Sequence, residues 1–486
     1  MTRVIPHSPL LSAALALPEM LAFDRFLSSR RSRRDRVSRD SNVAASHDAP
    51  RRDASHAPNG AGSAARRASA TAARREAPAT RPRIRIALYS HDTLGLGHLR
   101  RNLLIAEKLA SGPLQATVLL ITGAVEANFF QLPPGVDCLT LPRLQKSADG
   151  SYASGQLAIS VDDLVRLRAE AILSAMETFA PDVFVVDKVA TGAFGELLPA
   201  LRYCQTEGHA QCVLGIRDVL DDPATVRREW HDAGVDEFVE QFYNQIWVYG
   251  DQRVYDPIVE YDWSPTIASR VRFTGYLNQT ERTAESDFDP SKLLGDALAC
   301  DDARRPLAVC TLGGGKDGYA VAESFLLGAV GADVHAVVLT GPFMPPSQIA
   351  QLNALAAPHA NITVVDFLPG ADRLVGAADR VVAMGGYNTV CSILSHARHA
   401  LLAPRVVPRQ EQWLRAQRLQ RLGVVDVVHP SQLTPAAIRQ WLDRSESPTP
   451  SRNAIDMGGL QCIESLVGNL VACNATPHAA SCPENL

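Results

Sequence analysis

The chain has 486 residues, 46% of them hydrophobic, and carries a formal net charge of −4. This length leaves room for two α/β domains, each with a sizeable core, after an amino-terminal extension. Its nine cysteines are odd in number and include no CxxC pair. That pattern argues against both a disulfide framework and a zinc site, so we expect a cytoplasmic protein.

The first 85 residues differ in composition from the rest. They hold 17 arginines, seven acidic residues and no lysine, a formal charge of +10, which leaves −14 for the remainder. After Phe26 they contain too few apolar side chains to offset the entropy of an ordered chain, so residues 1–83 are predicted to be a disordered extension. Its charge suits peripheral contact with anionic lipid or nucleic acid, although a solvated extension or a start codon assigned too early fits equally well.

The apolar stretch Leu10–Phe23 is too short to cross a bilayer. We therefore expect no transmembrane segment. The protein should be free in the cytoplasm or peripheral to the inner face of the membrane.

A short apolar strand, Ile84–Tyr89, opens the folded part, and a helix is expected from about Leu99. The loop between them and the first helical turn contain two glycines, a histidine and an arginine, namely Gly95, Gly97, His98 and Arg101. Sites in α/β proteins form at such carboxyl ends of parallel strands, where glycines leave backbone amides open. The imidazole of His98 can take a proton from an acceptor hydroxyl or from water at neutral pH, whereas a lone histidine is more often structural.

Strands and helices then alternate, which predicts a parallel sheet covered by helices on both faces. The later strands are expected at Ala116–Thr122, Val136–Leu141, Asp182–Asp187, Gln211–Arg217 and Gln245–Gly250. Between them, the helix Val161–Ala180 is expected to pack through four side chains at helical spacing, Leu164, Leu167, Ala171 and Leu173.

Two strands of this first domain end in charged pairs, Asp187 with Lys188 and Arg217 with Asp218. Because the carboxyl ends of parallel strands share one edge of the sheet, these side chains are expected on the same edge as His98. Asp187 could orient His98 or act as the base itself, and its alternative role is to cap the helix that follows.

A segment with the composition of a linker divides the rest of the chain into two domains. The first domain is predicted over residues 84–275, a linker over 276–303, a second domain over 304–472 and a tail over 473–486. The linker carries Asp287 and Asp289 in a DxD order, but its composition and its position outside any strand end argue against a metal site. The second domain is expected to continue the alternation with strands at His335–Thr340, Ile362–Phe367 and His399–Ala403.

The second domain opens with the strand Leu307–Leu312 and the run GGGKDG. This run has neither Walker A spacing nor the GxGxxG fingerprint, so ATP hydrolysis and dinucleotide binding are poorly supported. Gly314 and Gly315 are candidates to approach a phosphate, and Lys316 could neutralise it. A tight turn with a solvated lysine is the alternative.

A second glycine turn follows the strand Arg380–Ala383. Gly385 and Gly386 let the backbone turn sharply, and Asn388 or Thr389 can cap the next helix. A helix N-terminus without side-chain bulk before it can hold a diphosphate without a metal, so neither a metal nor another cofactor is expected.

The stretch from Met384 to Gly423, with its glycine turn, proline loop and glutamine-rich helix, resembles the donor-domain signature of family 28 glycosyltransferases. That family includes the enzyme that adds N-acetylglucosamine to the lipid-linked peptidoglycan precursor. The resemblance implies the GT-B architecture, an α/β fold of two facing Rossmann-like domains. It also implies that a donor diphosphate lies at the glycine turn and the donor sugar near Arg409, Glu411 and Gln412.

One position departs from the family pattern. Ser392 stands where the family has a glutamate that binds the ribose, and a serine hydroxyl gives a weaker, neutral hydrogen bond. The pattern GxGHxxR around His98 resembles the first loop of family 28 and, equally well, that of related nucleotide-sugar hydrolases.

These observations predict a metal-independent glycosyltransferase that moves a hexosyl group from a nucleotide-sugar, in first place a UDP-sugar, to an acceptor. The acceptor is a glycan, a lipid-linked compound or a small molecule. A nucleotide-sugar hydrolase of the same fold is the main alternative, and an epimerase is a weaker one. A noncatalytic sugar-nucleotide-binding protein is the third, favoured by Ser392 and the basic extension.

Overall fold

A computed structural model describes residues 83–92, 96–146, 152–280, 305–366, 368, 370–444 and 454–475. The predicted extension up to residue 82, Gly95 of the first loop, and Asp287 and Asp289 of the linker lie outside the described residues, as does the tail beyond residue 475. Residues from Ile84 onward form one unit.

The first sheet has seven parallel strands in the order β3-β2-β1-β6-β7-β8-β9. Their bounds are β1 (Arg85–Ser90), β2 (Thr117–Thr122), β3 (Val136–Thr140), β6 (Val183–Asp187), β7 (Gln211–Arg217), β8 (Gln245–Tyr249) and β9 (Val271–Phe273). The six predicted strands agree with β1, β2, β3, β6, β7 and β8 to within about one residue at each end. The central strands β1, β6, β7 and β8 are apolar runs that are almost fully buried, whereas the edge strand β3 is only partly buried. The short strand β9 was not predicted.

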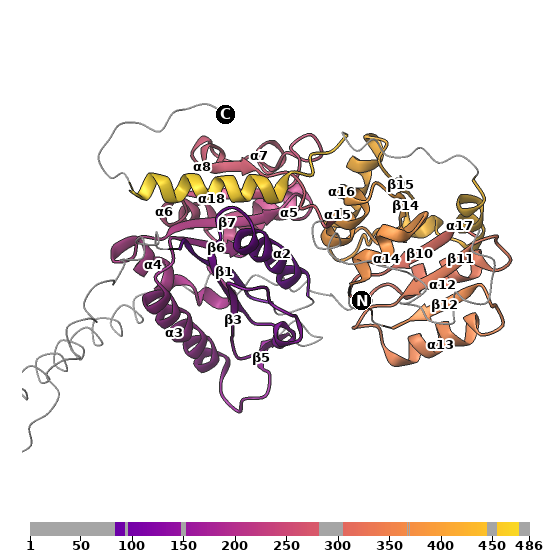
Figure 1. The fold of residues 1–486 in the computed structure, drawn as a ribbon, viewed down its shortest axis with the longest axis horizontal. Helices are drawn as coiled ribbons and strands as arrows, with labels where there is room; N and C mark the ends of the chain where they lie inside the picture. Colours follow the sequence, from indigo (N-terminus) through magenta and orange to yellow (C-terminus); the bar gives the residue numbers. More distant parts are fainter. Residues whose placement is uncertain are drawn as a thin grey trace, which may run out of the picture. The chain divides into compact units, whose positions relative to one another are not determined.

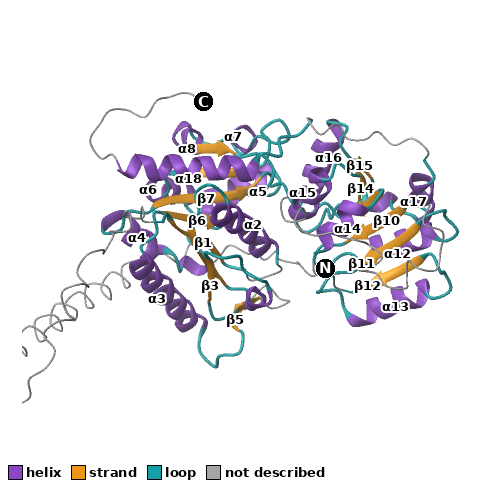
Figure 2. Ribbon diagram, viewed as in Figure 1, coloured by secondary structure: helices purple, strands orange, loops and turns teal. Residues whose placement is uncertain are grey.

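Helices cover both faces of this sheet (Figure 2). They are α2 (Gly97–Ser111), α3 (Val161–Phe179), α4 (Leu198–Thr206), α5 (Pro223–Asp232), α6 (Val235–Phe242), α7 (Pro257–Glu260) and α8 (Pro265–Arg270), with short 3-10 turns η1 (Val125–Phe129) and η2 (Ala193–Gly195) and the small hairpin β4 (Leu144–Lys146) and β5 (Tyr152–Ser154). Successive residues of β1 alternate between two core clusters: Ile86 and Leu88 belong to one, and Ala87 and Tyr89 to the other.

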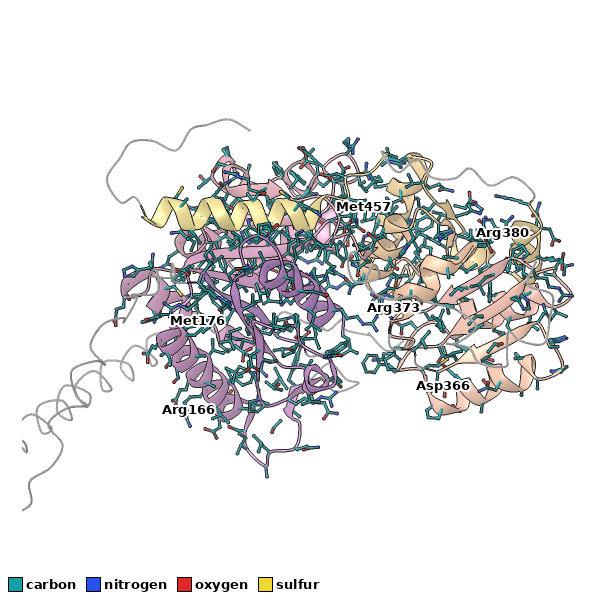
Figure 3. The ribbon with its side chains drawn as sticks, in the orientation of Figure 1. Arg166, Met176, Asp366, Arg373, Arg380 and Met457 are labelled. Carbon is teal, nitrogen blue, oxygen red and sulfur yellow. The ribbon has the colours of Figure 1, made fainter. Side chains whose placement is uncertain are left out.

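The helix α3 buries a different face from the one predicted. Leu164 is fully buried as expected, but Leu167 is 45% exposed, and Ile172 and Met176 take the core positions. Figure 3 labels Met176 on this helix. The reason lies in Arg168, which is fully buried and whose Nε donates to a carboxylate oxygen of Glu196 at 2.5 Å. This ion pair turns a polar position toward the core, which a pattern of apolar residues cannot anticipate.

The second sheet has six parallel strands in the order β12-β11-β10-β13-β14-β15. Their bounds are β10 (Leu307–Thr311), β11 (His335–Leu339), β12 (Ile362–Val365), β13 (Arg380–Ala383), β14 (His399–Leu402) and β15 (Asp426–Val427). The associated helices are α12 (Tyr319–Ala329), α13 (Pro346–Ala356), α14 (Ala371–Ala377), α15 (Tyr387–Ser395), α16 (Glu411–Arg421) and α17 (Pro435–Leu442), with η3 (Pro430–Gln432). The structure thus confirms an α/β fold with two Rossmann-like sheets.

The last helix, α18 (Gly459–Ala475), packs on elements of the first sheet, mainly α2 and β6 (Figure 1). Its buried side chains Leu460, Ile463 and Val467 join the same core cluster as Leu103 of α2. Glu464 also pairs with Lys108 of α2 at 3.8 Å. The predicted domain boundary at residue 472 assigned this segment to the second domain, because chain order alone does not reveal which sheet an apolar helix covers.

Chain order and strand order disagree at one point in each sheet. In the first sheet β1 lies between β2 and β6, and in the second β10 lies between β11 and β13. At such switch points the loops after the two central strands diverge and leave a crevice at the carboxyl edge, where α/β proteins bind ligands. The loops after β1, β6, β10 and β13, with the helix starts that follow them, carry the predicted site residues other than Arg409, Glu411 and Gln412, which follow β14. No helix in the ranges given above is long and apolar enough to span a membrane.

Candidate functional site

The switch point of the first sheet brings a histidine, an arginine and an aspartate together. His98 and Arg101 lie in the first turns of α2, and Asp187 is the last residue of β6. The Nδ1 atom of His98 is 2.6 Å from Oδ2 of Asp187, and Nη2 of Arg101 donates to Oδ1 of Asp187 at 2.6 Å. The same Nη2 lies 3.0 Å from Nδ1 of His98. Asp187 therefore contacts Nδ1 of His98, and no hydrogen bond to Nε2 of the ring is formed among the described residues.

Burial and charge fix the protonation of this group. Burial alone would raise the pKa of Asp187, but Arg101 and His98 outweigh it and hold the pKa of this carboxyl well below its usual value. Burial lowers the pKa of His98, and the raising effect of Asp187 offsets only part of that. At neutral pH the pair is thus a carboxylate beside a neutral imidazole, which is the state that a general base needs.

The second glycine turn presents an open helix start. Gly385 has φ +90°, a left-handed conformation that favours glycine, and Gly386 is the N-cap of α15. Asn388 or Thr389 was expected to cap this helix, but the helix already begins at Tyr387, so both residues lie inside its first turn and Gly386 takes the N-cap position. No side chain caps it, and a Cβ added at Gly386 would meet nothing within 4 Å. The first amides of α15 consequently face open space, where the helix dipole favours an anion.

Asn388 has another contact. Its Nδ2 donates to the backbone carbonyl of Gly97 at 2.9 Å, so it joins the start of α15 to the start of α2. Gly97 and Asn388 line one cavity of about 220 Å³. The other residues that line this cavity are Leu96, His98, Arg100, Arg101, Arg217, Gly313, Gly314, Pro342, Phe343, Gly386, Tyr387 and Thr389. His98 and the open start of α15 therefore face the same space.

The loop after β10 divides into a part that reaches the cavity and a part that does not. Gly313 and Gly314 line it, whereas Gly315 and Lys316 are absent from its lining. Gly315 has φ +87°, and a Cβ there would lie 2.0 Å from the carbonyl oxygen of Thr340. The structure thus gives Gly315 a packing reason to be glycine, and it leaves Lys316 exposed at the surface.

A second, narrower cavity lies beside α15 and is lined by Ser392, Thr389 and Arg100, among others. Ser392 is 1% exposed, and its Oγ has no hydrogen-bond partner among the described atoms. Two carboxylates, Asp366 of the loop after β12 and Asp372 of α14, line the same cavity. The cavity is thus lined by two acidic side chains as well as by Ser392.

The predicted sugar-binding residues around the start of α16 are already engaged by the protein. Arg409 pairs with Asp221 at 2.7 Å and with Glu229 at 2.8 Å. Glu411 pairs with Arg405 at 2.9 Å. The backbone amide of Arg405 also donates to Oε1 of Gln412, at 3.1 Å. None of the three predicted residues lines either cavity.

One buried group near the site was not found from sequence. Arg415 of α16 is fully buried, and its Nη2 donates to Oδ1 of Asp218 at 2.6 Å, while its Nη1 donates to the carbonyl of Gly385 at 3.2 Å. Tyr276 donates to the other oxygen of Asp218 at 2.6 Å. The only sequence signal was Asp218 at the end of a strand, and its partners lie 58 and 197 residues further along the chain.

Aromatic rings complete the contact between the two halves of the site. The guanidinium of Arg101 lies 5.5 Å from the ring centroid of Tyr387, and that of Arg415 lies 5.7 Å from it. Both distances suit a cation–π interaction. Tyr387 therefore lies between the first-sheet group at Asp187 and the buried pair at Asp218.

Within the described ranges, no group of three or more His, Cys, Asp and Glu side chains is arranged to hold a metal ion.

No protein-family model matches the chain, and no curated protein matches it. Solved structures with a similar fold include the glycosyltransferase of kitacinnamycin, at 17% identity and a TM-score of 0.52 over 80% of this chain and 100% of that one. The calicheamicin glycosyltransferase aligns at 17% identity and a TM-score of 0.53 over 82% and 100%. A putative UDP-N-acetylglucosamine 2-epimerase from Listeria monocytogenes aligns at 12% identity and a TM-score of 0.55 over 83% and 100%. The chain therefore has the GT-B fold that these proteins share.

Proposed function

We propose that this protein is a nucleotide-sugar glycosyltransferase that moves a hexosyl group to a hydroxyl of its acceptor. The observation that carries the proposal is the single cavity in which His98, held by Asp187, faces the uncapped start of α15. The glycosyltransferases of similar fold support this assignment at the level of architecture. A base and an anion site a few ångströms apart are the two groups that a sugar transfer from a nucleotide requires.

In this proposal the donor diphosphate lies at the amides of α15 and beside Gly313 and Gly314. Arg100, which lines both cavities, approaches it from the first sheet's side. As the bond between the sugar and the diphosphate breaks, negative charge builds up on the leaving phosphate. The helix dipole and Arg100 offset that charge without a metal ion.

The acceptor hydroxyl lies at Nε2 of His98. The imidazole takes the hydroxyl proton as the oxygen attacks the sugar carbon, and Asp187 stabilises the resulting imidazolium. Burial of the group by α15 limits the access of water, which would otherwise hydrolyse the donor.

The nucleoside lies in the narrower cavity beside Ser392. Asp366 and Asp372 supply carboxylates there, and we propose that they contact the ribose or base in place of the missing glutamate. A UDP-sugar is the first donor to test.

The test follows nucleotide release from UDP-, dTDP- and GDP-sugars, with and without an extract of cell acceptors. The variant His98→Ala should lose acceptor-dependent release, and the matched control His231→Ala, whose side chain is 90% exposed on α5, should keep it. Release that needs no acceptor would instead favour a hydrolase. Binding without release from any donor would favour the noncatalytic alternative. An unchanged rate in a roughly millimolar excess of chelator would support metal independence.

A further inference from the structure

Two positive side chains lie beside the His98 group without a role in the proposed chemistry. Lys188 directly follows Asp187 at the end of β6, and Arg217 is the last residue of the neighbouring strand β7. The backbone amide of Lys188 donates to the carbonyl of Gly215 at 2.7 Å, which holds the two strand ends together. Both residues are therefore on the carboxyl edge of the first sheet, next to the proposed base.

Most arginines around them have carboxylate partners. Arg101 has Asp187, Arg409 has Asp221 and Glu229, and Arg415 has Asp218. By contrast, in the part of the chain that the structure describes, the side chains of Lys188 and Arg217 form neither an ion pair nor a hydrogen bond. The Nε atom of Arg217 is buried and lacks any partner.

The two cations repel each other. Partial desolvation by the surrounding protein, followed by the charges of Arg217 and Arg409, lowers the pKa of Lys188 to about 8. Burial and the charge of Arg415 lower the pKa of Arg217 as well. The one carboxylate that acts on both, Glu411, is already paired with Arg405. The other carboxylates that act on the pair, Asp187 and Asp218, are likewise bound to other arginines. A bound anion would offset the remaining repulsion.

Lys188 also has an unusual backbone. Its φ is +70°, in the left-handed region that non-glycine residues rarely adopt. Such backbone strain is typical of functional sites, where the surrounding fold holds a residue in an unfavourable backbone conformation. The residue type is unusual too, because the whole chain has only five lysines.

The donor diphosphate does not account for Lys188, although Arg217 lines the cavity proposed for that diphosphate. Its proposed place is at the start of α15, Gly313 and Arg100, and Lys188 does not line that cavity. Instead, Lys188 directly follows Asp187, which holds His98, and its charge acts on His98 and on His91 after β1. An anion held by Lys188 and Arg217 would therefore lie on the acceptor's side of His98.

We propose that Lys188 and Arg217 form an oxyanion-binding subsite for the acceptor, which therefore carries a phosphate or carboxylate near the hydroxyl that receives the sugar. This assignment rests on the proposed function, because it takes His98 as the base. Arg217 reaches into the cavity and would contact the anion from the donor side, while the ammonium of Lys188 contacts it from the edge open to solvent. The subsite would select anionic acceptors over neutral ones of the same shape.

The test measures the reactivity of Lys188 toward an acetylating reagent in the full-length protein, by peptide mass spectrometry. The protein is first saturated with UDP, and binding of UDP is measured separately by calorimetry. Inorganic phosphate, acetate or chloride is then added at equal ionic strength. Lys108 of α2, paired with Glu464, is the reference lysine in the same digest.

With UDP bound, phosphate or acetate should slow acetylation of Lys188 about fivefold or more relative to chloride, with Lys108 unchanged. Which of the two protects better identifies the kind of acid group. The protection should fall in Arg217→Gln. Full protection of Lys188 by UDP alone would contradict the subsite, because it would show that Lys188 belongs to the donor site. The absence of protection by any anion would also contradict the subsite. Absence of UDP binding would contradict the proposed function itself, so the two failures are distinguishable.

Discussion

The substitution Asp187→Asn tests the His98 group most directly. Asp187 is fully buried and accepts from His98 and from Arg101, whose side chain is 2% exposed. An asparagine of the same shape has one oxygen and one NH2 group. The buried guanidinium can only donate, so the amide oxygen must turn toward Arg101 and the NH2 group toward Nδ1 of His98. Nδ1 must then accept a hydrogen bond, which places the ring proton on Nε2.

With its proton on Nε2, His98 has no lone pair for the acceptor hydroxyl. We expect kcat to fall about 10³- to 10⁴-fold, the scale found when the aspartate behind a catalytic histidine becomes asparagine. The pH profile provides a second readout. Asp187 raises the pKa of His98, so its loss should move the acidic limb of the residual kcat/KM profile to lower pH.

The assay is acceptor-dependent nucleotide release between about pH 5 and 9, with a thermal melt of each variant to exclude unfolding. Asp182→Asn is the matched control, because Asp182 lies just before the same strand and accepts from the amide of Arg85 at 2.7 Å. A loss of less than tenfold in Asp187→Asn, or an acidic limb that moves to higher pH, would refute the tautomer argument.

Three further predictions concern stability and linkage. Arg415→Leu leaves Asp218 buried without its cation and should lower the free energy of unfolding by about 3 to 5 kcal/mol in denaturant titrations. The control Asp443→Ala, which breaks an exposed pair with Arg439, should lower it by at most about 0.5 kcal/mol. Equal losses in the two variants would contradict the role of burial. Gly315→Ala should lower the free energy of unfolding by more than about 2 kcal/mol, because it combines left-handed backbone strain with a clash against Thr340. The control Gly468→Ala in α18, where an added Cβ meets only one atom at 3.9 Å, should be neutral or stabilising. A neutral Gly315→Ala would contradict the packing argument. The lowered pKa of Asp187 contributes stability that is complete above the unfolded pKa of about 4 and is lost as pH falls toward the folded pKa. Between about pH 5 and 2.5 the wild type should therefore lose more stability than Asp187→Asn. Parallel curves of stability against pH would contradict this prediction.

Much of the fold could be read from local pattern. The strands β1, β6, β7 and β13 are apolar runs of four to seven residues bounded by polar residues, and such runs form buried parallel strands in almost any context. The glycine turns after β10 and β13 were also visible, because sharp turns at strand ends require glycine. Placing His98 and Asp187 at one edge followed from the rule that parallel strands end on the same side.

Other features depend on partners far along the chain. The stripe predicted on α3 was shifted by the buried pair of Arg168 with Glu196, and the contacts of α18 with α2 and β6 join elements far apart in the chain, which an apolar face alone does not predict. Arg409, Glu411 and Gln412 followed from family resemblance, whereas the fold engages them in contacts with charged neighbours and the backbone. Whether they also reach a donor sugar stays a prediction.

The sequence by itself determined the α/β class, the two sheets and the loops that carry the site, because periodicity and glycine position are local properties of the chain. Only the tertiary structure decided which charges meet. It placed Arg101 on Asp187, buried Arg415 against Asp218 and left Lys188 and Arg217 without an ion pair among the described residues. Electrostatic pairing depends on distances of a few ångströms between residues 86 and 197 positions apart in these two pairs, and no local pattern encodes those distances.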